Sequence, residues 1–283
     1  MIAFLSHLVN GVSLGSVYAI IALGYSMVYG IAKMLNFAHG DVIMVGAYVC
    51  YCAMQYWGMP PILGILLSMV VCTLLGMLIE FGAYRPLRQA TSLAVLITAI
   101  GVSYLLQNLA LLIWGANPKV FSSVVGLGSI SLFNGELLIS GEALITILVS
   151  VLIMVGLTIF TGRTRMGKAM RAVSEDRGAA QLMGINVNRT ISLTFAIGSA
   201  LAAIAGVLLC SSYPALMPTT GSMPGIKAFT AAVFGGILLG VIESLAKAYI
   251  STQLSNSIVF AVLIIILLVR PAGLLGKHTQ EKV

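Results

Sequence analysis

Eight apolar stretches follow one another along this chain, and they restrict its possible folds more than any other feature. Most are near the ~20 residues that a helix rising 1.5 Å per residue needs to cross ~30 Å of hydrocarbon. The longest polar interval between them is 161–190. The stretches cover residues 11–32, 41–57, 61–83, 92–114, 143–161, 191–213, 228–250 and 257–271.

The composition excludes a soluble globular protein. Hydrophobic residues make up 59% of the chain and charged residues only 8%, whereas soluble domains are about one-quarter charged. The first stretch is too long for a signal-peptide core and lacks a basic segment before it, so we expect a retained first helix and no soluble catalytic domain. We therefore predict an all-α, polytopic membrane protein with about eight transmembrane or re-entrant helices and a short cytoplasmic helix, forming one domain over residues 1–283.

The distribution of Lys and Arg predicts the orientation, because these residues accumulate in cytoplasmic loops. Residues 115–141 and 213–225 contain Lys119 as their only basic residue and are rich in turn formers, so we expect extracytoplasmic turns there. The formal charge of +7 then reflects topology in a lipid membrane and indicates no nucleic-acid partner. The basic residues placed in the cytoplasm are Arg85, Arg88, those of residues 162–190, and Arg270, Lys277 and Lys282 of the tail.

The basic interval 162–190 has the pattern of a short amphipathic helix. Met166, Met170 and Val173 recur at helical spacing among Arg and Lys residues. Further along, Gly184 is a helix stop signal. The sequence from Ala179 and Ala180 to Gly184 would let another protein approach the backbone closely. A solvated positive-inside loop is the simpler alternative.

Two patterns in the chain resemble a nucleotide site and a metal site, but neither has the residues that such a site needs. Residues 162–169 fit the phosphate-binding loop until Ala169, which replaces the magnesium-binding hydroxyl, and an expected helix rather than a strand precedes them. If ATP drives this protein, another subunit binds it. The four cysteines lie in apolar runs without metal-site spacing, so we expect no metal and no cofactor in this chain.

A polar junction between the first two apolar stretches is a candidate site. It contains Asn36, Phe37, His39, Gly40 and Asp41. The junction suits either a broken helix that lines a cavity or an ordinary interfacial turn, with Asp41 at the membrane edge. We expect His39 to be a satisfied turn residue because no second His is nearby.

The other acidic residues in apolar stretches have simple explanations as ion pairs. Glu80 lies about one turn before Arg85, and we expect these two to pair at the cytoplasmic boundary. Glu243 and Lys247 stand at i, i+4 in the favourable order, which predicts a mutual ion pair.

Several motifs together resemble one family, the permease subunits of bacterial ATP-binding-cassette importers for branched-chain amino acids, and most closely the first of their two permease subunits. The resemblance extends over essentially the whole chain. It rests on residues 10–24 (NGVSLGSVYAIIALG), 36–41 (NFAHGD), 85–88 (RPLR), 170–172 (MRA), 175–176 (ED), 179–186 (AAQLMGIN) and 270–276 (RPAGLLG).

The resemblance implies a mechanism and partners. The 162–190 interval would be the coupling element that docks in a cytoplasmic ATPase subunit, through Glu175, Asp176, Ala179, Ala180 and Gly184. Implied partners are a second permease subunit, two ATPase subunits that hold ATP and magnesium, and a periplasmic amino-acid-binding protein. The chain would translocate Leu, Ile and Val across the bacterial inner membrane by alternating access, as a transport subunit and not an enzyme.

Three alternatives remain open from the sequence. A permease of the same family could carry another small amide or amino acid such as urea. An ion-coupled secondary transporter would usually place carboxylates at mid-membrane. A membrane enzyme would need a cluster of reactive side chains, which the three scattered His residues do not provide.

One departure from the family pattern concerns Gly235 and Gly236, which belong with the polar junction to a possible substrate path. Family members usually carry a connector of about ten residues after these glycines, like the loop of a re-entrant helix pair. Here the apolar stretch 228–250 runs straight on. A full crossing would put the basic tail outside, so we predict a bend near Gly235 and Gly236, both ends on the outer side, a cytoplasmic C-terminus and a weakened pathway.

Overall fold

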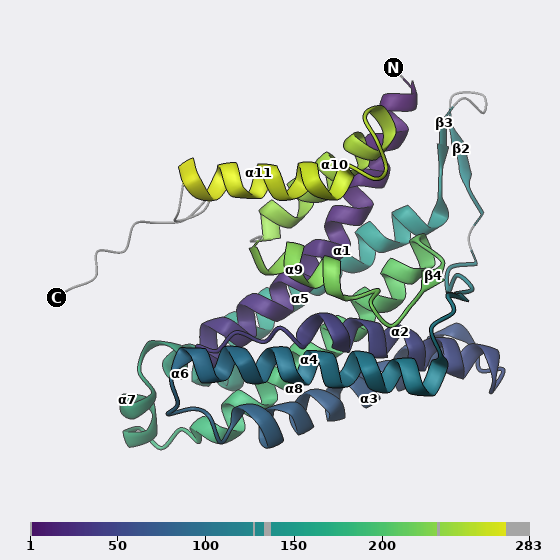
Figure 1. Cartoon of the computed structure of the whole chain (residues 1–283). Coiled ribbons are helices and arrows are strands. Elements are labelled where there is room, and N and C mark those ends of the chain that lie inside the picture. Colours follow the sequence, from purple (N-terminus) through teal and green to yellow (C-terminus); the bar gives the residue numbers. More distant parts are fainter. Residues whose placement is uncertain (1, 127, 133–136, 231–232, 270–283) are drawn as a thin grey trace.

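The computed structural model describes residues 2–126, 128–132, 137–230 and 233–269, and it is predominantly helical (Figure 1). The predicted all-α membrane fold is confirmed. The helices are α1 (Ile2–Ala32), α2 (His39–Gln55), α3 (Pro61–Ile79), the π-helical turn η1 (Glu80–Tyr84), α4 (Ser92–Trp114), α5 (Gly141–Arg163), α6 (Arg165–Glu175), α7 (Arg177–Leu182), α8 (Val187–Ser212), α9 (Ser222–Thr230), α10 (Val233–Tyr249) and α11 (Ser255–Val269).

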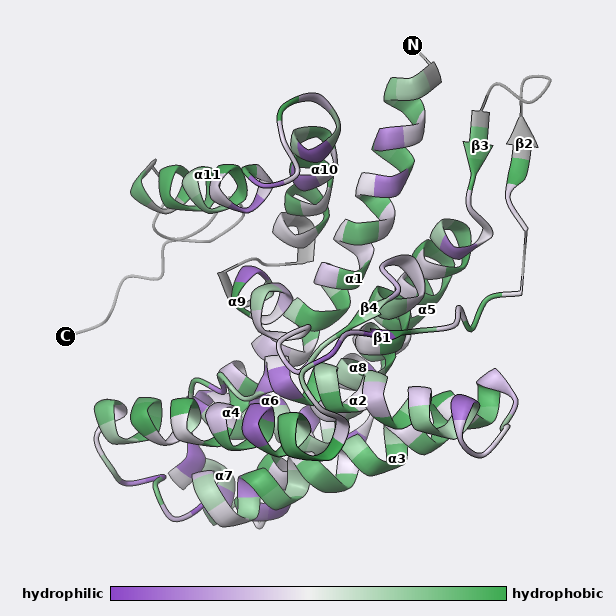
Figure 2. Cartoon of the chain, turned by 45° about the vertical axis from the view of Figure 1, so that its right-hand side comes forward, coloured by the Kyte–Doolittle hydropathy of each residue, from purple (hydrophilic) through white to green (hydrophobic). Residues whose placement is uncertain are grey.

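The long apolar helices divide into a buried centre and an outer layer. In the most apolar part of each helix, 83% of the residues are buried in α1 and 78% in α8, against 28% in α3 and 17% in both α4 and α5. The outer helices expose large apolar side chains, such as Leu112 and Ile62. The ribbons of α3 and α4 are mostly in the green of hydrophobic residues in Figure 2. Helices that are apolar on their exposed faces fit contact with lipid.

The two ends of the molecule differ in charge and structure. Helices α6 and α7 lie at one end, which we call the basic end (Figure 1). The opposite end carries two short antiparallel strand pairs, β1 (Lys119–Val120) with β4 (Ala215–Leu216), and β2 (Ile130–Leu132) with β3 (Leu137–Ile139). Residues 115–141 and 213–225, where turns were expected, thus also contain short paired strands.

Helix α10 packs antiparallel against α1. Each helix contributes two glycines at i, i+4 spacing to the contact, Gly11 and Gly15 from α1 and Gly236 and Gly240 from α10. A Cβ at Gly240 would lie 2.1 Å from the Gly15 nitrogen, and one at Gly11 would lie 2.8 Å from the Val241 Cα. A Cβ at Gly236 would lie 3.0 Å from the Ala19 nitrogen of α1. Small residues at this spacing allow membrane helices to pack backbone against backbone.

The segment from α8 to the end of α10 enters the fold and returns. The Lys247 ammonium lies 4.9 Å from the Tyr213 ring centroid, and the Tyr249 ring packs edge-on against His7. Both ends of this segment therefore lie opposite the basic end, in keeping with the prediction that it does not cross the membrane. The bend was predicted near Gly235 and Gly236, which lie inside α10. Helix α9 ends at Thr230 and α10 begins at Val233, and the two residues between them lie outside the described residues.

Candidate functional site

The chain turns back into the fold after α1. Residues 33–38 are not helical, and α2 begins at His39, whose ring lies 4.7 Å from the Tyr25 ring. Tyr25 precedes the end of α1 by seven residues, which corresponds to about 10 Å along a helix. Helix α2 thus begins within the membrane-spanning part, and the structure favours a broken helix over an interfacial turn.

Asp41 lies in the first turn of α2 and is only 1% exposed. Its Oδ1 accepts a hydrogen bond of 2.9 Å from Gln107 Nε2. The positive end of the helix dipole also favours a carboxylate in the first turn. Asp41 is therefore buried and hydrogen-bonded inside the fold.

His39 is buried, and its Nε2 has no hydrogen-bond partner in the part of the chain that the structure describes. The ring packs against Gly24, where a Cβ would lie 2.9 Å from it. The expectation of a satisfied turn residue was wrong, because the turn places the ring in a packed interior rather than in water.

The start of α2 packs against the start of α9 through the backbone atoms of glycines. A Cβ at Gly221 would lie 1.7 Å from the Gly40 oxygen, and one at Gly225 would lie 2.9 Å from the Gly40 Cα. Gln107 Nε2 lies 3.3 Å from Ser222 Oγ as well as hydrogen-bonding to Asp41. Two interrupted helices therefore begin at one polar junction inside the fold.

The remaining residues of the possible substrate path lie apart from one another. Asn36 is buried and accepts a hydrogen bond of 2.9 Å from the Tyr84 hydroxyl, while Phe37 is half-buried. Gly236 is packed against α1, and Gly235 is half-buried one residue before it in α10. His39 and Gly40 lie together at the start of α2. The six residues do not line either of the two cavities at the ends of the described part of the molecule.

A buried ionic network joins α9, α10, α11 and α1. Glu243 Oε2 accepts hydrogen bonds from Lys227 Nζ at 2.7 Å and from the Tyr18 hydroxyl at 2.8 Å. Lys247 Nζ lies 2.8 Å from Glu243 Oε1, which confirms the predicted i, i+4 pair. Lys227 also donates to Asn256 Oδ1 at 2.7 Å. Sequence reasoning missed Lys227; a lone Lys in an apolar stretch was the available signal.

At the basic end, the predicted amphipathic helix is confirmed as α6. Its N-terminus is capped by Thr164 Oγ1, which accepts from the Gly167 backbone N–H at 3.0 Å. Met170 and Val173 are buried, whereas the polar face is exposed. Residues 162–169 join two helices rather than a strand and a helix, so the phosphate-loop context is absent there.

Helix α7 has well-defined ends. Asp176 Oδ1 accepts from the backbone N–H groups of Gly178 and Ala179, and Glu175 ends α6 just before it. Gly184 has φ of +81°, which glycine adopts without strain, and the Ile185 N–H donates to the Ala180 carbonyl. The predicted stop signal at Gly184 is confirmed.

The surface of α7 differs from the sequence expectation. Ala179 and Gly184 are exposed, but Ala180 is only 3% exposed and packs within the chain, so it does not offer an open docking surface. Leu182 and Met183 are 90% and 83% exposed. Sequence reasoning missed these two, although an apolar pair in a basic loop was a signal for a docking contact.

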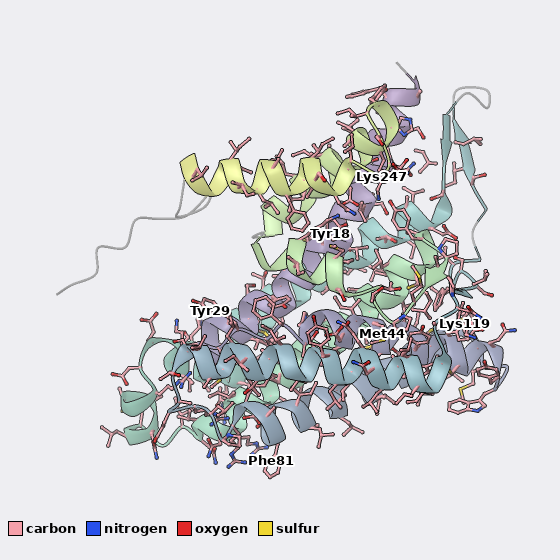
Figure 3. The ribbon with its side chains drawn as sticks, in the orientation of Figure 1. Tyr18, Tyr29, Met44, Phe81, Lys119 and Lys247 are labelled. Atoms are coloured by element: carbon pink, nitrogen blue, oxygen red, sulfur yellow. The ribbon has the colours of Figure 1, made fainter. Side chains whose placement is uncertain are left out.

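Two arginines fasten the basic end to the membrane helices. Arg177 donates to the Ala32 carbonyl at the end of α1, and burial, with a smaller effect of Arg88, lowers the pKa of its guanidinium. Arg88 pairs with the buried Glu80 carboxylate, which also accepts from Ser192 Oγ at 2.6 Å. The predicted Glu80–Arg85 pair was therefore wrong, and Arg85 instead lies over the Phe81 ring. Phe81 projects outward at the lower edge of Figure 3.

The described residues form a cavity near each end. The larger, about 680 Å³, lies at the basic end between the end of α1 and the start of α7, and it is lined by Lys33, Arg88 and Arg177 among others. The other, about 460 Å³, lies near the opposite end between α1, α5, α8 and α10. No group of three His, Cys, Asp or Glu side chains within the described residues could hold a metal ion.

Comparisons with known proteins identify the family. Residues 7–268 match the family described as branched-chain amino acid transport system / permease component. The chain is 44% identical to the high-affinity branched-chain amino acid transport system permease protein LivH of Escherichia coli K12, over 99% of this chain and 98% of LivH. It is 42% identical to the BraD protein of the same description from Pseudomonas aeruginosa, over the same shares.

The LivH alignment spans 303 positions against the 283 residues of this chain, so LivH contains residues that this chain lacks. A solved structure, PsaBC from Streptococcus pneumoniae in complex with Fab, is similar at a TM-score of 0.48 and 14% identity, over 92% of this chain and 89% of that chain. From the family match and the full-length identity, the chain belongs to the family of branched-chain amino acid transport system permease components.

Proposed function

We propose that this chain forms half of the membrane pore of an ATP-driven importer, paired with a second permease subunit. Two cytoplasmic ATPase subunits bind ATP and magnesium, and a periplasmic binding protein delivers the amino acid. The chain itself makes and breaks no covalent bond. It changes shape when the ATPase subunits close, and this alternately opens the path to either side.

One observation carries the ATPase part of the proposal. Helix α7 exposes Ala179, Leu182 and Met183 at the basic end, and Arg177 fastens the same short helix to the α1 carbonyl end. An exposed apolar patch rimmed by polar residues is typical of a protein contact. A partner that moves α7 would therefore move α1, against which α10 packs.

The substrates follow from the relatives and from the chemistry of the spans. LivH and BraD are named as branched-chain amino acid permeases, and we infer that this chain carries Leu, Ile and Val. Ionisable side chains are few in the membrane helices and those inside are paired or hydrogen-bonded, such as Glu243 and Asp41. This environment suits aliphatic side chains better than anionic or sugar ligands.

The orientation belongs to the same proposal. The basic end faces the cytoplasm, because Lys and Arg concentrate there, and the membrane is the bacterial inner membrane. The tail after α11 then ends in the cytoplasm; it lies outside the described residues. An ATPase that docks on α7 requires this orientation.

Co-purification tests the proposed docking surface. The tagged chain is co-expressed with an ATPase subunit encoded beside it, and the amount of ATPase that is recovered is measured for wild type, Leu182→Asp and Met183→Asp. Because both side chains are exposed, we expect normal membrane insertion but at least about tenfold less ATPase, as for a lost interface hot spot.

Arg85→Gln is the matched control, because Arg85 is an exposed basic residue that lies outside the 162–190 interval. Its ATPase recovery should equal that of wild type. Recovery of normal amounts of ATPase with both aspartate variants would contradict docking on α7.

A further inference from the structure

The cavity near the opposite end has charges of both signs in its wall. Glu142 reaches it from the first turn of α5, and Lys247 from the last turn of α10. The two helices are far apart in sequence and reach this cavity beside the end of α8. Figure 3 places Lys247 at the upper part of the α10 ribbon, near the start of α1.

The two charged groups are available to a ligand. Glu142 is half-buried and makes no ion pair or hydrogen bond through its carboxylate in the described part of the chain. The Lys247 ammonium lies 2.8 Å from Glu243 Oε1, and its side chain remains 28% exposed and lines the cavity. A ligand carboxylate can therefore reach this ammonium group.

The rest of the lining is mixed. Leu14, Val17 and Leu209 provide an apolar wall, and Asn10, Ser13 and Ser212 provide hydrogen-bonding groups. The volume of about 460 Å³ falls in the range of about 300–1,000 Å³ that is usual for small-molecule sites. A ligand that matches this lining carries one anionic group, one cationic group and a small aliphatic part.

We propose that this cavity binds a free aliphatic amino acid as its zwitterion, on the side where the binding protein delivers it. The substrate carboxylate lies at Lys247, the substrate ammonium at Glu142, and the aliphatic side chain against Leu14, Val17 and Leu209. The inference rests on the proposed function and adds the location of the first binding site in the permease.

A cysteine at position 212 in the assembled transporter tests the site. Ser212→Cys places a thiol in the cavity wall, and its reaction with a membrane-impermeant maleimide is followed in vesicles while leucine is added. The parent chain gives the background, because its native cysteines are buried or half-buried. We expect leucine to slow the labelling, and leucinamide and 4-methylpentanoate, which each lack one charge, to protect at least about tenfold less well.

Charge-removing variants in the same background then assign the two groups. Glu142→Gln and Lys247→Gln should each raise the leucine concentration needed for protection by at least about tenfold. Lys119→Gln removes a charge near the same end but outside the cavity, and protection should not change. If the Lys247→Gln variant fails to insert into the membrane, the result for Glu142→Gln alone decides whether the charged groups bind leucine.

Leucine uptake by the same vesicles distinguishes failure of the binding site from failure of the proposed transport function. A complex that takes up leucine while leucine leaves the labelling unchanged overturns the binding site but not the proposed function. Protection that is equal in wild type and Glu142→Gln overturns the assignment of the charges. Absence of leucine uptake by a complex in which leucine slows the labelling overturns the proposed function but not the binding site.

Discussion

At the scale of single residues, the contact between α1 and α10 depends on glycines that leave no room for a side chain. A Cβ at Gly240 would lie 2.1 Å from the Gly15 nitrogen and 2.6 Å from the Gly11 oxygen. These are backbone atoms, so they cannot rotate away as a side chain can. The same contact holds the helix that carries Glu243 against the helix that carries Tyr18.

We therefore expect Gly240→Ala to separate the two helices. Inserting one methyl group into a packed interior usually costs about 1–3 kcal/mol, and the thermal stability of the purified protein in detergent should fall accordingly. Gly156→Ala is the control, because nothing lies within 4 Å of its Cβ position, and its stability should stay equal or rise. Equal stability of the two variants would contradict the tight α1–α10 contact.

A second residue-scale prediction concerns Arg88. Its loss would leave the Glu80 carboxylate, which is 1% exposed, with the Ser192 hydroxyl as its one remaining side-chain partner among the described residues. Removing one partner of a buried ion pair costs about 3–5 kcal/mol, so Arg88→Ala should lower the midpoint of thermal unfolding strongly. Arg85→Ala removes an exposed cation over Phe81 and should change the unfolding free energy by less than about 1 kcal/mol. A larger loss of stability in Arg85→Ala than in Arg88→Ala would instead support the pairing of Glu80 with Arg85.

The sequence could not identify these partners because tertiary structure selects them. Glu80 begins a π-helical turn, and the Arg85 N–H donates to the Glu80 carbonyl. This turn directs the Arg85 side chain outward, and the following residues bring Arg88 back to Glu80. Spacing did identify the local Glu243–Lys247 pair. Lys227 comes from another helix, and no helical period relates it to Glu243.

At the scale of elements, α7 has one exposed and one buried alanine side by side. We predict that Ala179→Trp leaves insertion and stability intact while uncoupling ATP hydrolysis from transport, because Ala179 is exposed and Ala180 is not. Ala180→Leu should instead destabilise the permease itself, by about 1–3 kcal/mol for overpacking. The measurements are ATPase activity, leucine uptake and thermal stability of the reconstituted complex. Normal uptake with Ala179→Trp would remove α7 from the coupling contact.

Elements with a strong local pattern were predicted correctly and those with long-range partners were not. Helix α6 follows from the spacing of Met166, Met170 and Val173. The pairing of β1 with β4 joins residues 119–120 to residues 215–216, and such short strands carry too few residues for a pattern. A bend was expected near Gly235 and Gly236, but both residues lie inside α10, where Gly236 permits close packing against α1.

At the scale of the whole molecule, the path of α9 and α10 determines the topology. Because this segment returns to the end where it enters, α11 can cross toward the basic end. A reporter inserted after Thr252 should report the outside, and one fused after Val283 should report the cytoplasm. Reporter activity on the same side at both positions would contradict this arrangement.

The most direct test of the account is leucine uptake by vesicles that contain this chain together with its second permease subunit, two ATPase subunits and the binding protein. We expect uptake that requires ATP on the ATPase side, is lost when this chain is omitted, and is reduced by isoleucine and valine but not by aspartate or a sugar. Leucine uptake that an ion gradient drives without ATP, or ATP-driven uptake of a sugar with leucine ineffective as a competitor, would contradict it.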